Sequence, residues 1–154
     1  MEISPKWKSH PLAQKGLVEL VPTDWVYQFR GPDVTPEASL MDGSAADMET
    51  LWQNINEEGM SDPLIIRVGA KNRKFRLESG NHRIQIFKKY GIEHTPIVVQ
   101  VQDECGPQAD DVMNTGTHNF DFADDVIETN LKPGYLKPSE VFKSLAEKIG
   151  GGLT

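Results

Sequence analysis

The sequence has a single cysteine, Cys105, among its 154 residues. One cysteine excludes an internal disulfide and any zinc cluster built from several cysteines. No apolar run approaches the length of about 18 residues that a membrane span needs, so we expect no membrane partner. The N-terminal stretch MEISPKWKSHPLAQKG contains no apolar stretch of the signal-peptide type. We therefore expect a cytoplasmic protein.

Positive charge is also scarce, since 16 Lys and Arg face 23 Asp and Glu for a net charge of −7. This balance argues against a general nucleic-acid coat. The charge is uneven, however. Residues 67–89 carry many Lys and Arg with one acid, Glu78, whereas residues 101–131 carry several acids and no Lys or Arg. Two interpretations of the basic segment stay open: a face that meets phosphate, and a solvated hairpin surface.

The order of apolar patterns predicts one domain. Residues 1–16 are polar and contain prolines, which predicts a flexible arm, and residues 17–154 are expected to form a single domain. We expect a strand near 17–21, a turn at PTDW and a loop over 30–45. Met48, Leu51, Trp52 and Ile55 recur at helical spacing, and Gly59 is expected to end that helix.

The second half of the chain alternates strands and helices. Strands are expected at 62–68 and 74–78 around a turn at 69–73, followed by a helix over 82–90 and a strand over 95–101. The acidic stretch 102–126 is expected to be a long loop. Residues 137–149 show an amphipathic pattern that predicts one final helix.

The tetrapeptide at 80–83 stands where the second helix begins. A helix start presents free N–H groups and a partial positive charge. Gly80 permits close approach of an anion, Asn81 is a capping residue, and Arg83 is able to grip phosphate with two N–H groups. The pattern therefore fits a phosphate cradle, while an ordinary turn and helix cap remains the alternative.

Three separated marks and the order of elements resemble the N-terminal domain of ParB partition proteins, in the ParB/sulfiredoxin superfamily. The first mark is Gly59 followed by Asp62-Pro63, and the second is the turn Gly80-Asn81-His82-Arg83. The third is the stretch TNLKPGYLKPSE, with Asn130 and Leu131 in place. The likeness covers residues 17–150. It implies an α+β domain with a small mixed sheet and helices packed around it.

The resemblance also implies a ligand, usually CTP with a divalent metal, and ATP in other branches. The expected phosphate contacts are Gly59, Gly80, Asn81, His82, Arg83 and Asn130. Mg²⁺ is expected to be shared with Asn130 or Glu128, and Arg30 matches a family Arg that is a candidate anion or DNA contact. For hydrolysis, His82 or Glu78 is the group expected to orient a water.

The sequence departs from the family at several positions, which leaves the base of the nucleotide and ParB-type clamp closure undecided. The family's Glu-Arg-Arg becomes Asn81-His82-Arg83, and Asn81 also replaces the nucleophilic Cys of sulfiredoxin, so that chemistry is not expected. The chain closes with GGGLT where ParB proteins continue into a helix-turn-helix. We therefore expect no sequence-specific reading of the major groove.

Two alternatives to nucleotide binding stay open. The first is a metal-dependent DNA nuclease. Its metal would be held in the acidic stretch HNFDFADD, which includes Asp121, and its DNA would lie on the basic hairpin residues Arg73, Lys74 and Arg76. The second is a non-catalytic interaction module of a phage or plasmid system, with a partner protein that binds DNA. A homodimer is compatible with each of these.

Overall fold

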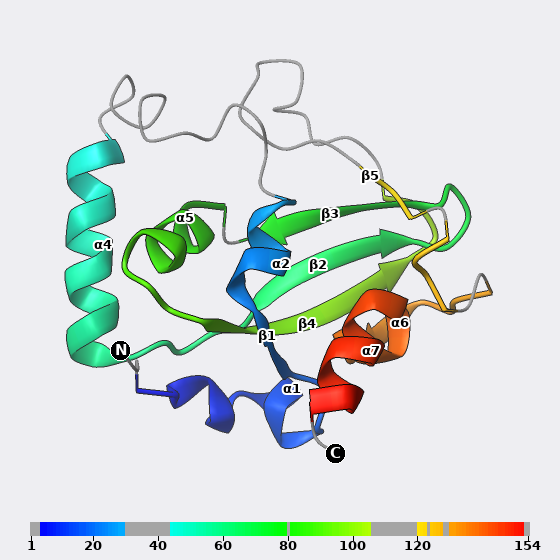
Figure 1. Ribbon diagram of the computed structural model, residues 1–154, viewed down its shortest axis with the longest axis horizontal. Helices are drawn as coiled ribbons and strands as arrows, with labels where there is room; N and C mark the ends of the chain where they lie inside the picture. The colour runs from blue at the N-terminus through cyan, green and yellow to red at the C-terminus, as the bar shows by residue number, and fades with distance from the viewer. Residues whose placement is uncertain are drawn as a thin grey trace.

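The protein is an α+β domain built on a mixed β-sheet, shown in Figure 1. The computed structural model describes residues 4–29, 44–79, 81–105, 120–122, 124–127 and 130–152; residues 44–48, 51, 79, 81–82 and 148–152 are described by their backbone alone. Within these residues the strands follow the order β1-β4-β2-β3-β5, and β6 also pairs with β4. The strands are β1 (Glu19–Pro22), β2 (Leu64–Gly69), β3 (Lys74–Ser79), β4 (His94–Gln102), β5 (Phe120–Asp121) and β6 (Gly134–Leu136).

Strand β4 is the centre of the sheet. It runs parallel to β2 along one side, and its other side pairs antiparallel first with β1 and then with β6. Its residues Thr95–Val99 are all buried, as is Val101. A continuous apolar run such as PIVV is typical of a strand that is covered on both faces.

Helices cover the face of the sheet that carries the main core. Helices α2 (Thr23–Tyr27), α6 (Pro138–Val141) and α7 (Lys143–Gly152) lie in front of the strands in Figure 1. The ring of Phe142 lies 5.2 Å from Trp25 of α2 and 5.2 Å from Phe75 of β3, both in edge-to-face geometry. Such aromatic contacts add to the burial of apolar area that holds these layers together.

Helices α4 (Ser44–Glu58) and α5 (Asn81–Lys89) confirm the predictions made from helical spacing. Each is followed by a glycine with positive φ, Gly59 at +90° and Gly91 at +72°. Only glycine adopts this backbone region without strain, so both positions work as helix stops. The two helices meet through Trp52 and Tyr90, whose rings stack at 4.2 Å.

The structure differs from the sequence prediction around Trp25 and at the C-terminal helix. The expected turn at PTDW is the first turn of α2. The single helix expected over 137–149 is two helices, because Phe142 is extended (φ −105°, ψ 119°) and bridges to Val126. This tertiary pairing breaks a helix that the apolar spacing alone would continue. The short strands β5 and β6 were not expected either.

The segment expected to be a flexible arm contains two short helices within residues 4–16. It forms a 3-10 helix η1 (Lys6–Ser9) and α1 (Pro11–Gln14). Trp7 is 9% exposed and belongs to the core cluster. Polar composition suggested an arm, but one buried tryptophan contributes enough apolar area to attach it.

Most of two expected loops, 30–45 and 102–126, lies outside the described residues. Among the helices that the structure describes, none has the length and apolar character needed to cross a membrane.

Asp125, in the acidic stretch 102–126, contacts the N-terminus of α7, and this contact can be tested. The carboxylate of Asp125 accepts hydrogen bonds from the backbone N and the Oγ of Ser144, both at 2.9 Å. We expect Asp125→Ala to lower the free energy of unfolding by about 1–2 kcal/mol, as loss of a helix cap does. Urea unfolding of Asp124→Ala, an exposed neighbour, is the matched control, with an expected change within about 0.5 kcal/mol. Equal losses in both variants would contradict the cap.

Candidate functional site

The β2–β3 hairpin decides what lies beside the start of α5. The two strands are antiparallel, and Ile65 near the start of β2 is paired with Ser79 at the end of β3. Residues that precede β2 are therefore neighbours of residues that follow β3. The loop 59–63 and the first turn of α5, about 20 residues apart in sequence, meet at one end of the sheet.

The first turn of α5 is electrostatically open to an anion. The helix has no acidic residue in its first turn, and Lys88 and Lys89 stand in its last turn. Lysines at a C-terminus complement the helix dipole, while the N-terminal N–H groups keep their partial positive charge. Buried residues from Ile84 to Phe87 embed the middle of the helix in the core, so its start is held in place.

Arg83 links this helix start to the loop before β2. Its Nη1 donates a hydrogen bond to the backbone carbonyl of Asp62 at 3.0 Å. Burial lowers the pKa of Arg83 from its ordinary value, and the negative charge of Asp62 acts in the opposite direction. A partly desolvated guanidinium has lost some of its hydration, so a suitably placed anion interacts with it more strongly than in open water.

The loop 59–62 is also held from its other side by the N-terminal segment. The backbone N of Met60 donates to the carbonyl of Ser4 at 3.0 Å, and the backbone N of Trp7 donates to the carbonyl of Met60 at 2.7 Å. His10 Nε2 lies 3.8 Å from the Asp62 carboxylate. The sequence interpretation missed these residues. Pro11 was an available signal, since proline at the first helical position marks a helix start.

Glu78, a candidate for orienting a water, is engaged with two arginines. Its Oε2 accepts from Arg76 Nε at 2.7 Å, and its Oε1 lies 3.2 Å from Arg67 Nη1. Arg67 also donates a hydrogen bond to Oε1 of Gln100, and the Gln100 side-chain amide donates to the hydroxyl of Tyr135. These side chains form a polar row across β3, β2, β4 and β6. The carboxylate thus has a structural role in the sheet, and its geometry gives no support to a role as a base.

The basic hairpin is largely neutralised by partners within the chain. Arg76 is 4% exposed and pairs with Glu78, and Lys74 forms an ion pair with Asp121. The guanidinium of Arg73 lies over the ring of Phe122 at 4.7 Å. The charges of Arg76 and Lys74 are therefore paired within the chain, and Asp121, proposed as a metal ligand, forms an ion pair with Lys74.

Asn130 lies away from the α5 start. Gly134 is paired with Val101, at the level of Phe75 near the beginning of β3. Gly134 and Ser79 are separated by four residues along the strands, at about 3.3 Å each, and by three strand spacings across the sheet, at about 4.8 Å each. The distance between them is therefore about 20 Å. The chain enters β6 from the end of the sheet where the β2–β3 turn lies, and Asn130 is in the segment that leads into β6. The geometry does not bring it to the phosphates that α5 would hold.

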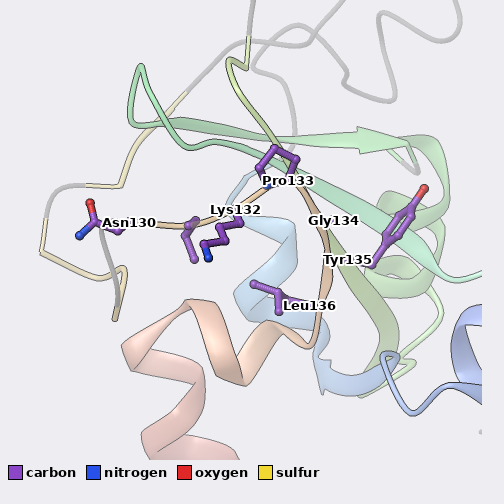
Figure 2. Close-up of a pocket in the computed structure, with 7 residues that line it drawn as sticks. Asn130, Lys132, Pro133, Gly134, Tyr135 and Leu136 are labelled. Carbon is purple, nitrogen blue, oxygen red and sulfur yellow. The ribbon is translucent and has the colours of Figure 1, made fainter.

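Asn130 instead lines a hollow of about 310 Å³ formed by residues 130–136. Figure 2 shows its lining, with Leu136 directed toward α6 and Tyr135 pointing away on the other side of the strand. Among the described residues, no group of three His, Cys, Asp or Glu is placed to hold a metal ion. The hollow is lined by one continuous segment of the chain. Among its described lining residues, the polar side chains are those of Asn130, Lys132 and Tyr135.

Several predicted site residues fall outside the described part of the chain. Gly80, Arg30 and Glu128 are not described, nor are the side chains of Asn81 and His82. The described core of the candidate site is therefore the backbone of the first turn of α5, Arg83, and the loop from Gly59 to Pro63.

Comparison with protein-family models, with curated proteins and with solved structures finds no match to this chain. The likeness to the ParB/sulfiredoxin superfamily accordingly depends on the three sequence marks and on the order of the elements.

The paired charges of β3 generate a stability test. We expect Arg76→Met to lower the free energy of unfolding by about 3 kcal/mol, because it leaves a carboxylate in a half-buried row without its main donor. Lys74→Met is the matched control on the same strand, and loss of its exposed ion pair should cost less than about 1 kcal/mol. Urea unfolding of both proteins measures the difference. Similar losses would show that Arg76 acts as a surface residue.

Proposed function

We propose that this chain is a ParB-like nucleotide-binding domain that holds the phosphates of CTP or ATP at the start of α5. The observation that supports the proposal is the hydrogen bond from Arg83 to the carbonyl of Asp62. It joins two of the three sequence marks, the loop after Gly59 and the turn before α5. Two separated patterns that resemble one family's ligand site are therefore in direct contact.

The chemistry of this place suits a phosphate. Backbone N–H groups at a helix start point toward a ligand and act together with the helix dipole. The absence of an acid in the first turn of α5 leaves that field uncompensated by the helix's own side chains. Only backbone groups and one arginine are required, so the site does not depend on the identity of the base.

Arg83 contributes a second set of donors. A guanidinium carries five N–H groups in a fixed plane, and the carbonyl of Asp62 occupies one of them through Nη1. This bond fixes the plane of the group, and its remaining edge is suited to two parallel hydrogen bonds with phosphate oxygens. Lysine would keep the charge but lose this geometry.

Magnesium enters the proposal with the nucleotide. Mg²⁺ keeps several waters and binds mainly through phosphate oxygens and one or two carboxylates, so a cage of protein ligands is not needed. Because Glu78 is engaged with Arg76 and Arg67, we limit the proposal to binding and do not assign a base for hydrolysis.

The nuclease alternative has less support from the described residues. Its DNA-contacting residues and its metal ligand Asp121 are partners of one another or of neighbouring groups. The interaction-module alternative makes a simple contrasting prediction, which is that the chain binds no nucleotide.

Thermal unfolding with CTP, ATP, GTP and UTP, each with and without Mg²⁺, tests the proposal. A ligand at 100 times its dissociation constant stabilises the fold by about 2.7 kcal/mol, so Tm should rise by roughly 5–10 °C. We expect Arg83→Lys to reduce the shift and Arg83→Met to abolish it.

The control is Lys143→Met, which removes one exposed positive charge from α7 and should leave the shift unchanged. An undiminished shift in Arg83→Met would place the ligand elsewhere. No shift with any nucleotide in the unaltered protein would favour the interaction module.

A further inference from the structure

We propose that the N-terminal segment 4–16 is a positioning element of the α5 site, which orients Arg83 through the loop 59–62 and thereby raises its affinity for phosphate. The identity of the ligand rests on the function proposed above. The orientation of Arg83 by the segment does not rest on that function, since it is a property of the unliganded chain.

The segment is joined to the loop at the level of the backbone. The two hydrogen bonds Met60 N to Ser4 O and Trp7 N to Met60 O engage both polar groups of Met60. Burial of the Trp7 side chain in the core attaches the segment at this point. Met60, which precedes Asp62 by two positions, is therefore held through both its N–H and its carbonyl.

Gly59 shows how close this contact is. A Cβ at residue 59 would lie 2.8 Å from the carbonyl oxygen of Ser4 and 2.9 Å from its Cβ, closer than real side chains approach. The glycine thus has two functions: it ends α4 with a positive φ, and it admits the N-terminal segment against the loop.

His10 reaches the same loop from α1. Its Nδ1 accepts a hydrogen bond from the backbone N of Leu12, so in the neutral ring the proton is on Nε2. That nitrogen lies 3.8 Å from the Asp62 carboxylate. Asp62 is consequently contacted at its side chain by the N-terminal segment and at its carbonyl by Arg83.

This arrangement changes affinity because Arg83 has a long side chain. Ordering such a side chain on binding costs free energy that corresponds to roughly 2- to 10-fold in affinity. A carbonyl that is itself fixed orders the guanidinium before the ligand arrives. If the loop 59–62 is less ordered, the Arg83 side chain must become ordered when the ligand binds, and the affinity falls. This holds even though no residue of the segment touches the ligand.

Two glycine variants provide a matched test. Gly59→Ala and Gly91→Ala both place a side chain at a positive-φ helix stop, but a Cβ at Gly91 meets nothing within 4 Å. Backbone strain is common to both variants, and displacement of the N-terminal segment is specific to the first. His10→Asn is the second variant, because an asparagine keeps a capping oxygen for α1 and lacks the atom that faces Asp62.

The first measurement is the ¹H–¹⁵N spectrum of each full-length protein without ligand. We expect Gly59→Ala and His10→Asn to shift or broaden the Arg83 side-chain Nε–H signal and the backbone signal of Met60, and Gly91→Ala to leave them in place. An Arg83 signal unchanged in both test variants overturns the positioning role, whatever the protein binds. If Gly59→Ala does not fold, His10→Asn decides the outcome.

The second measurement is the calorimetric affinity for CTP and ATP with Mg²⁺. We expect Gly59→Ala to bind roughly 2- to 10-fold more weakly than Gly91→Ala, with His10→Asn in the same direction. Equal affinities overturn the inference while leaving the nucleotide site intact. If the unaltered protein binds neither nucleotide, the proposed function fails, and the ligand-free spectra still decide whether the segment positions Arg83.

Discussion

The antiparallel pairing of β2 with β3 is the constraint from which the candidate site follows. Because Ile65 is opposite Ser79, the chain entering β2 and the chain leaving β3 are brought to one place. Strand β3 returns the chain to the end of the sheet where β2 begins, and α5 then connects β3 to β4, which lies parallel to β2 on its other side. At about 1.5 Å per residue the nine residues of α5 span about 13 Å, enough to pass from β3 over β2 to β4. The helix begins directly after β3, so its start lies beside the loop that follows Gly59.

Charge pairing explains a pattern that was ambiguous in the sequence. The basic segment is followed by an acidic one, and the fold sets them against each other: Lys71 faces Asp103 and Lys74 faces Asp121. Each exposed pair contributes little to stability. Together with the Arg76–Glu78 pair they lower the positive potential of the hairpin, and Arg83 is a cation placed instead beside a helix start.

Local signals in the sequence predicted much of the fold. The spacing of Trp52 and Ile55, the strand at 74–78 and the helix stop at Gly59 reflect short-range physics, and each was located close to its observed place. The break at Phe142 was not predictable, because it depends on a pairing with Val126 that is distant in sequence. The short helices of residues 6–14 were not predicted for a similar reason, since the backbone N of Trp7 donates to the carbonyl of Met60, which is distant in sequence.

The candidate site was predictable in part. Gly59, Asp62 and Arg83 were recognised as marks, and the hairpin brings them together. Asn130 was grouped with them because sequence marks carry no distances, and the register of β6 places it at the other end of the sheet. The roles of His10 and Ser4 were missed, since they depend on contacts with Asp62 and Met60, which are distant in sequence.

The most direct test of the central claim is a ¹H–¹⁵N titration of the full-length protein with CTP and with ATP in the presence of Mg²⁺. The account predicts saturable shifts that are largest for the backbone N–H groups of Asn81 to Arg83 and for the side chain of Arg83. Shifts concentrated at residues 130–136, or no saturable shift anywhere, would contradict it.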